Sequence, residues 1–93
     1  MYIGLLTLTF SLPGCGSLKE KRGRLRGLKD RFGKQPNLAV SETGLHDVHQ
    51  SAQWSFVVLC ANRAQGDQML AQIEQYAVTD LDVVVVDRQL ERF

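Results

Sequence analysis

A length of 93 residues is enough for one domain and excludes a chain with separate substrate and cofactor domains. A hydrophobic content of 44% and a charged content of 23% are typical of globular proteins and argue against disorder. The net charge of +1 hides an uneven distribution, because residues 17–34 contain eight of the eleven Lys and Arg residues and two of the ten acids. The apolar N-terminus is too short to span a membrane and lacks the basic lead of a signal peptide. We therefore expect a cytoplasmic protein that is a single domain over residues 1–93.

The first predicted element is a half-buried strand over residues 5–12. Leu6, Leu8 and Phe10 alternate there with hydroxylated residues, which is the period of a strand with one buried face. Pro13 and the glycine after it end the strand, because proline has no amide to donate and glycine permits a turn.

A helix is predicted to begin at Ser17. Ser17 stands three residues before Glu20, which is the spacing of a capping box. An apolar stripe at about 100° per residue then faces the sheet. The stripe consists of Leu18, Leu25, Leu28 and Phe32.

Basic residues surround this stripe, and two glycines, Gly23 and Gly27, lie on the face opposite it. One flank of the stripe carries Lys19, Arg22, Arg26 and Lys29, and the other carries Arg24 and Arg31.

The rest of the chain predicts three more strands and one more helix. The expected elements are a strand over 38–42, a long polar connection over 43–53, a strand over 54–60, a helix over 63–78 capped by Asn62, and a strand over 82–90. The order βαββαβ predicts an α+β fold, the ferredoxin-like split βαβ arrangement. We expect a four-stranded antiparallel sheet with two helices on one face.

The last two predicted strands are apolar on both sides, which a sheet with one solvated face does not explain. The run of valines at 83–86 also predicts an unprotected edge on the fourth strand. We expect a second copy of the chain to cover the open sheet face or this edge, giving a homodimer. The alternative is that sheet twist and the chain termini cover the surface.

The same element order occurs in RNA-recognition modules, which stack bases on aromatic residues of two strands. Tyr2, Trp54 and Phe56 partly match those positions. Tyr2 has the parity of Leu6 and Leu8, however, so it is expected to point toward the helices and away from RNA.

A catalytic or metal site is poorly supported. His46, Asp47 and His49 lie close together, but two histidines without a further ligand nearby are more typical of a solvated loop. Cys15 has no histidine near it in the turn to activate it. We therefore expect no enzyme, no metal, no cofactor and no small-molecule substrate.

Several short segments resemble the bacterial YlxP-like family, domain of unknown function 503. They are Ile3-Gly4, Pro13-Gly14, "SLKEKR" at 17–22, Val40-Ser41-Glu42 and the stretch from Asp47 through Gln50 to Ala52. The resemblance implies a small ferredoxin-like protein whose genes are often found beside those of translation initiation and ribosome maturation factors. It also implies an RNA- or ribosome-associated role.

Three interpretations of the basic helix remain open. In the first, the chain is a small non-enzymatic factor that binds ribosomal RNA or a ribosomal subunit through residues 17–34. In the second, it is a homodimeric interaction module whose basic helix binds an acidic protein surface. In the third, the charges are solvated and have no partner. The candidate phosphate contacts are Lys19, Lys21, Arg22, Arg24, Arg26, Lys29 and Arg31.

Overall fold

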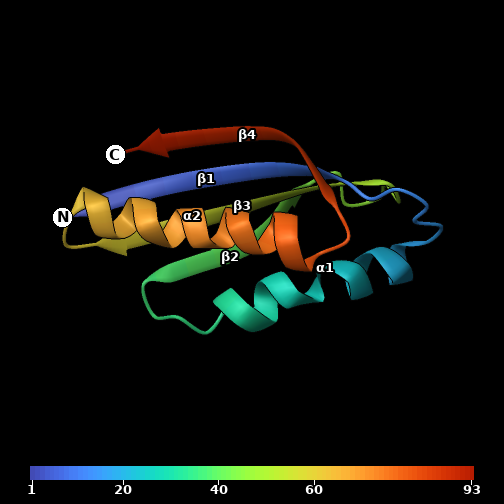
Figure 1. Cartoon of the computed structure of the whole chain (residues 1–93), viewed down its shortest axis with the longest axis horizontal. Coiled ribbons are helices and arrows are strands. Elements are labelled where there is room, and N and C mark those ends of the chain that lie inside the picture. Colours follow the sequence, from blue (N-terminus) through green and yellow to red (C-terminus); the bar gives the residue numbers. More distant parts are fainter.

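The structure, a computed structural model, describes residues 1–93. In chain order the elements are β1 (Tyr2–Ser11), α1 (Leu18–Phe32), β2 (Leu38–Gly44), β3 (Ser51–Cys60), α2 (Arg63–Asp80) and β4 (Val84–Arg92). The strands form one antiparallel sheet in the order β2-β3-β1-β4, and both helices lie on one face of it (Figure 1). The predicted ferredoxin-like α+β fold is confirmed.

The core lies between the two helices and the sheet face that they cover. Leu6, Leu8 and Phe10, on the helix side of the central strand β1, have no exposed surface. Phe56 of β3 and Ile73 of α2 belong to the same cluster of 17 buried residues. Burial of each large apolar side chain contributes about 1.5–3 kcal/mol, so this cluster is the main force that docks the helices on the sheet.

Helix α1 begins where its capping residues predict. The Ser17 hydroxyl accepts a hydrogen bond from the Glu20 amide at 3.0 Å. The Glu20 carboxylate in turn accepts one from the amide of Gly16 at 2.8 Å. The capping box is therefore present, with its carboxylate reaching one residue further back than the usual pattern.

The predicted apolar stripe of α1 holds for three of its four members. Leu25, Leu28 and Phe32 are buried, whereas Leu18 in the first turn is half-buried. One polar residue shares the buried face, because only 2% of Lys21 is exposed. The sequence did not predict this burial.

The polar connection predicted over residues 43–53 is mostly strand. β2 continues to Gly44 and β3 begins at Ser51, so the loop between them covers only residues 45–50. β3 pairs with β1 along its whole length, from Ser11 opposite Ser51 to Tyr2 opposite Cys60. The prediction was wrong because a strand with one solvated face tolerates polar side chains on that face.

The C-terminal elements are shifted from their predicted bounds. Helix α2 begins after Asn62, whose side chain accepts a hydrogen bond from the Gln65 amide at 2.9 Å, as predicted. It ends at Asp80 instead of residue 78, and β4 spans Val84–Arg92 instead of residues 82–90. Neither helix is long and apolar enough to cross a membrane.

β4 lies at an edge of the sheet, as expected, but its valine run does not form an uninterrupted pairing edge. Thr9 of β1 pairs with Asp87 and Phe10 pairs with Val85, so Val86 is an extra residue that bulges from the ladder. A bulge twists an edge strand and hinders pairing with another chain. The bulge therefore interrupts the edge at the valine run, whereas residues 87–92 pair with β1 without a break.

The open face of the sheet, on the side away from the helices, has an apolar end and a hydroxylated end. At the apolar end, 39% of Val57 and 48% of Leu59 are exposed. Their cross-strand neighbours are Leu5 and Ala39 for Val57 and Ile3 for Leu59. We call these five residues the open-face patch.

The aromatic residues of β1 and β3 point toward the helices. Tyr2 is 7% exposed, Phe56 is fully buried, and Trp54 has the same parity on β3 as Phe56. The predicted orientation of Tyr2 is confirmed, and Trp54 and Phe56 also face the helices, so these rings form no stacking platform on the open face.

Candidate nucleic-acid interface

The basic residues of the protein divide into two groups according to their partners. Five of the eleven lie within 4.0 Å of a carboxylate oxygen. These ion pairs are Lys21 with Glu42, Arg24 with Asp82, Arg63 with Asp67, Arg88 with Glu74 and Arg92 with Asp67. Every basic residue outside residues 17–34 is thus paired.

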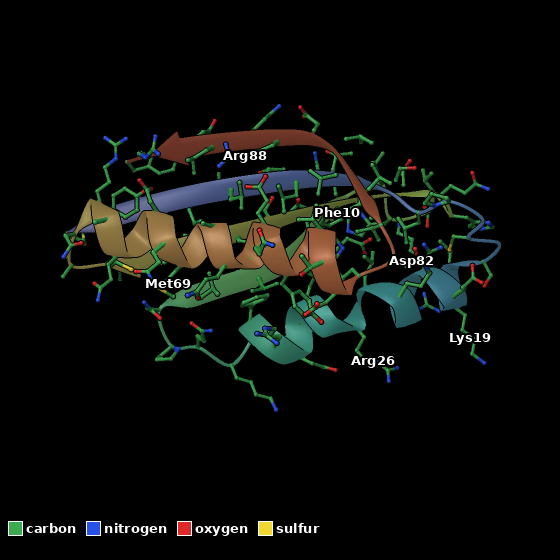
Figure 2. The ribbon with its side chains drawn as sticks, viewed as in Figure 1. Phe10, Lys19, Arg26, Met69, Asp82 and Arg88 are labelled. Atoms are coloured by element: carbon green, nitrogen blue, oxygen red, sulfur yellow. The ribbon has the colours of Figure 1, made fainter.

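The unpaired basic residues are all found in residues 17–34. They are Lys19, Arg22, Arg26, Lys29, Arg31 and Lys34, and all are exposed. Figure 2 shows Lys19 and Arg26 extending from α1 away from the body of the protein. Four of them lie along one side of the helix, and we call this group the free flank: Lys19, Arg22, Arg26 and Lys29.

Lys21 was predicted as a phosphate contact, but the structure buries its side chain. Its ammonium donates hydrogen bonds to the carbonyls of Leu45 at 2.7 Å and Val48 at 2.8 Å. It also lies 3.3 Å from the Glu42 carboxylate. Two of the three donors of this ammonium are thus bonded to backbone carbonyls, and Glu42 supplies the counter-charge inside the protein. Lys21 therefore anchors the β2–β3 loop and is not available to a ligand.

Arg24 was also predicted as a phosphate contact, and it too is committed to the fold. Its guanidinium donates to the Pro13 carbonyl at 3.0 Å and to the Asp82 carbonyl, and it lies 3.4 Å from the Asp82 carboxylate. Only 17% of the side chain is exposed. Arg24 joins the turn after β1 to the loop before β4, so its guanidinium has little capacity for an external phosphate.

Arg31 is exposed, but it lies on the side of α1 that is next to α2 and not on the free flank. Its guanidinium carbon lies 4.9 Å from the centre of the Tyr76 ring, in a cation–π arrangement. Gly27, predicted to lie on the outer face, also meets this tyrosine, because a Cβ at Gly27 would clash with the Tyr76 hydroxyl. Gly23 has no neighbour within 4 Å of such a Cβ. One glycine thus permits the contact between the helices, and the other lies in open solvent.

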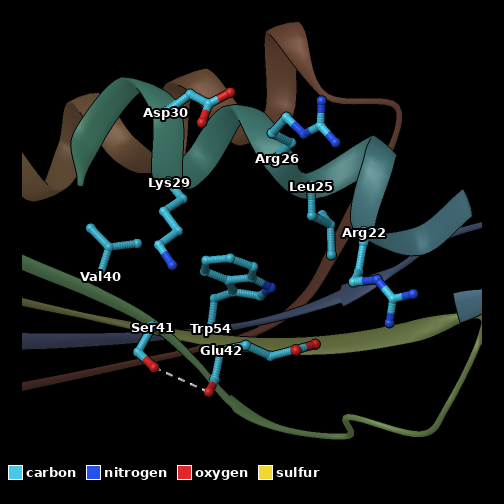
Figure 3. A pocket seen from close by; sticks show the side chains of 9 residues that line it. All are labelled: Arg22, Leu25, Arg26, Lys29, Asp30, Val40, Ser41, Glu42 and Trp54. Carbon is cyan, nitrogen blue, oxygen red and sulfur yellow. Dashed lines mark hydrogen bonds between the residues drawn. The ribbon is translucent and has the colours of Figure 1, made fainter. Parts of the chain in front are cut away.

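A cleft of about 570 Å³ separates the free flank from β2. Figure 3 shows Trp54 standing between the helix and the strand, with the Lys29 amine on one side of the indole and Arg22 on the other. The cleft is lined by Arg22, Leu25, Arg26, Lys29, Asp30, Val40, Ser41, Glu42 and Trp54. It brings three residues of the free flank next to the only tryptophan of the chain.

The contribution of Trp54 to this surface was not predicted. The sequence grouped Trp54 with Phe56 on one side of its strand, but it did not indicate how far α1 stands from β2. The indole is half-buried, and its Nε1 is a buried donor without a hydrogen-bond partner.

The loop with His46, Asp47 and His49 does not gather metal ligands. The structure contains no group of three or more His, Cys, Asp or Glu side chains placed to hold a metal ion. His46 Nε2 lies 3.3 Å from the backbone carbonyl of Glu42 in β2. Cys15 and Cys60 are both buried, and they do not form a disulfide.

Comparisons with known proteins give a family and a fold. The family described as "Protein of unknown function (DUF503)" matches residues 3–90. No curated protein has a significantly similar sequence. The structural-genomics protein YJCS is similar over 96% of this chain and 96% of its own, with a TM-score of 0.62 and 10% identity. A hydantoinase/carbamoylase family amidase from Burkholderia ambifaria is similar over 99% of this chain and 27% of the amidase, with a TM-score of 0.53 and 10% identity. Identities this low indicate a shared fold alone.

Proposed function

The chain belongs to the DUF503 family, whose function is unknown, and we propose that it is a small non-enzymatic factor that binds RNA through the free flank of α1. The observation that carries this proposal is the distribution of unpaired charge. All basic residues outside residues 17–34 are neutralised by acids, and the six unpaired ones lie within that segment. The positive potential of the protein is therefore concentrated on one helix, although its net charge is only +1.

The geometry of the free flank suits a nucleic-acid backbone. The four residues of the free flank are exposed along nearly three helical turns, a length of roughly 15 Å at 1.5 Å per residue. Successive phosphates of one strand can therefore meet successive side chains. Contacts of this kind fix the position of a protein on RNA without reading the sequence.

The choice of RNA over an acidic protein surface rests on the family resemblance. YlxP-like proteins are encoded beside translation initiation and ribosome maturation factors, which favours ribosomal RNA or a ribosomal subunit as the partner. Neighbouring genes are an association and supply no mechanism. The test must therefore measure RNA binding directly.

The test is the affinity of the pure protein for small-subunit ribosomal RNA across a salt series. If four to six phosphates are engaged, the logarithm of affinity should fall with the logarithm of salt at a slope of about −3 to −5. A variant with Lys19, Arg22, Arg26 and Lys29 changed to Gln should lose most of this slope.

A matched control separates the free flank from overall charge. Changing Gln65, Gln68, Gln72 and Gln75 of α2 to Glu lowers the net charge by the same amount, and all four are exposed. We expect this control to keep most of the salt slope. Equal loss in both variants would mean that net charge alone governs binding, and weak binding by the wild type would reject the proposal.

A second candidate is the homodimeric interaction module, and the open-face patch is the observation that favours it. The five residues of the patch carry no charge, and Glu91, the cross-strand neighbour of Leu5 on β4, lies at its border. The bulge at Val86 favours this face over the β4 edge as the contact. Light scattering after size exclusion should give twice the chain mass of 10.4 kDa, and a Val57→Lys/Leu59→Lys variant should restore the monomer.

A further inference from the structure

The cleft between α1 and β2 has the size and the lining of a ligand site. Its volume of about 570 Å³ falls within the range of about 300–1,000 Å³ that is common for small-ligand sites. One wall is the free flank, which supplies Arg22, Arg26 and Lys29, and Trp54 stands inside (Figure 3). Cationic groups next to an aromatic ring are the combination that single-stranded nucleic-acid sites use.

We infer that this cleft takes one unpaired base of single-stranded RNA, which stacks on Trp54 while the free flank holds the phosphates on either side. The inference rests on the proposed function, because the same basic residues serve both. It adds that RNA is bound as a single strand with a base turned out. A base in a duplex remains stacked and paired, so it cannot enter such a cleft.

The apolar part of the lining explains why a base is favoured over a phosphate alone. Leu25 of α1 and Val40 of β2 also line the cleft, together with the indole. A phosphate gains nothing from these groups, whereas the flat face of a base removes their surface from water. Stacking does not depend on which base is bound, so little sequence preference is expected.

No hydrogen bond fixes the orientation of the indole. Trp54 Nε1 has no hydrogen-bond partner, so only packing holds the ring in its orientation. A rotation that turns the ring face toward a base therefore breaks no hydrogen bond. It also brings an unsatisfied donor toward the polar edge of the ligand, which corrects an unfavourable feature of the free protein.

The two acids of the cleft do not cancel its positive charge. Glu42 lies 3.3 Å from the ammonium of the buried Lys21, which neutralises it. Figure 3 shows the Asp30 carboxylate on the outer side of α1, directed away from Trp54. The three basic residues of the free flank therefore dominate the field at the mouth of the cleft.

The experiment uses Trp54 as its own reporter, because it is the only tryptophan. The wild-type protein is titrated with a uridine oligonucleotide of about eight nucleotides and with an abasic oligonucleotide of the same length. We expect uridine to change the fluorescence of Trp54 and to bind about tenfold more tightly than the abasic chain. This comparison needs no variant and so does not depend on the folding of one.

Variants then assign the preference to the indole. By anisotropy of a labelled oligonucleotide, Trp54→Leu should bind uridine and abasic chains equally and keep the wild-type salt slope, whereas Trp54→Phe should retain part of the tenfold preference. Tyr76→Leu removes an aromatic ring outside the cleft and should leave the preference unchanged. Asp30→Asn should strengthen binding of both chains a few-fold, since it removes a negative charge beside the phosphates.

Each other outcome has a definite meaning. If both oligonucleotides bind equally to the wild type with a steep salt slope, the base inference is overturned and the proposed RNA binding stands. If neither oligonucleotide binds although small-subunit ribosomal RNA does, the inference is overturned and the proposed function stands; if ribosomal RNA does not bind either, both fail. If a polyglutamate peptide changes the fluorescence of Trp54 and RNA does not, the cleft is a site for an acidic protein segment and the inference is overturned.

Discussion

The basic residues of α1 that turn inward and those of the free flank are of the same types but differ in what they contact. Lys21 and Arg24 turn inward and together donate hydrogen bonds to four backbone carbonyls. Arg22 and Arg26, their neighbours in sequence, make no ion pair and line the cleft. A run of charge in a sequence is therefore not one functional unit. The phase of the helix decides which charges stabilise the fold and which are left for a partner.

The inward basic residues and the free flank also differ in how much they contribute to the stability of the fold. A buried ammonium is tolerated when it is hydrogen-bonded and paired with an acid, and Lys21 meets that condition through two backbone carbonyls and Glu42. An exposed cation contributes little to stability, and the stacking of like charges at Arg22 and Arg26 subtracts a few tenths of a kcal/mol. The inward pair should thus be sensitive to mutation in stability assays, and the free flank in binding assays.

The largest effect on stability is expected at Lys21. Lys21→Met keeps most of the side-chain length but removes the ammonium, leaving the Leu45 and Val48 carbonyls and the Glu42 carboxylate without this donor. We expect the free energy of unfolding to fall by about 3 kcal/mol, the low end for a broken buried ion pair, because Glu42 remains partly solvated. Urea unfolding followed by circular dichroism measures the change.

Arg22→Met is the control for this variant, because it makes the same type of change at the next residue. Its free energy of unfolding should stay within about 0.5 kcal/mol of the wild type. If both variants lost the same amount, Lys21 would contribute no more than a surface charge and the contrast between the two groups would be wrong.

A smaller loss is expected at Arg24. Arg24→Gln shortens the side chain and removes the hydrogen bonds that join Pro13 to Asp82, which should cost about 1–2 kcal/mol. Arg26→Gln, on the free flank, should leave the midpoint of thermal unfolding nearly unchanged while weakening RNA binding. Indistinguishable midpoints for the two variants would show that the turn and the loop hold together without Arg24.

Much of the fold was predictable because its signals are local. The alternation of Leu6, Leu8 and Phe10 and the capping pair of Ser17 and Glu20 depend on residues close in sequence, and both were confirmed. The burial of Lys21 also has a local signal in the sequence. Lys21 stands four residues before Leu25 and seven before Leu28, so it shares their face of the helix.

The site was less predictable because it joins parts that are distant in sequence. The cleft exists because β2 pairs with β3 and brings Val40 and Trp54 beneath α1. No spacing along the chain encodes the gap between a helix and an edge strand. The contact of Gly27 with Tyr76 is of the same kind, since it depends on how closely the two helices approach.

The two glycines of α1 also differ in what they contact, because Gly27 meets α2 and Gly23 faces solvent. Gly23→Ala should raise the free energy of unfolding by about 0.8–1.0 kcal/mol, because the site is open and alanine favours the helix. Gly27→Ala should gain less or lose stability, because its methyl group meets the Tyr76 hydroxyl. Thermal unfolding of both variants decides this. Equal gains would mean that Tyr76 moves aside at no cost and that Gly27 is not required.

The smallest effect is expected at Asp67, where paired charges lie outside α1. Asp67 accepts a hydrogen bond from the Tyr2 hydroxyl at 2.8 Å, and Arg92 and Arg63 also contact it. These contacts, that of Tyr2 foremost, hold the pKa of Asp67 below its ordinary value. The folded state thus favours the ionised carboxylate. Its contribution to stability is present above the ordinary pKa of about 4 and is lost as the pH falls through the lowered value.

Asp67→Asn should therefore unfold at a lower temperature than the wild type at neutral pH, and the difference should shrink as the pH falls below about 4. Asp87→Asn is the control, because Asp87 is exposed on β4 and makes no ion pair. Its difference from the wild type should be small throughout the series. If the difference in unfolding temperature between Asp67→Asn and the wild type stayed constant with pH, the stabilisation would come from packing around Tyr2. The ion pairs at this end of the sheet would then contribute as little to stability as the unpaired charges of the free flank.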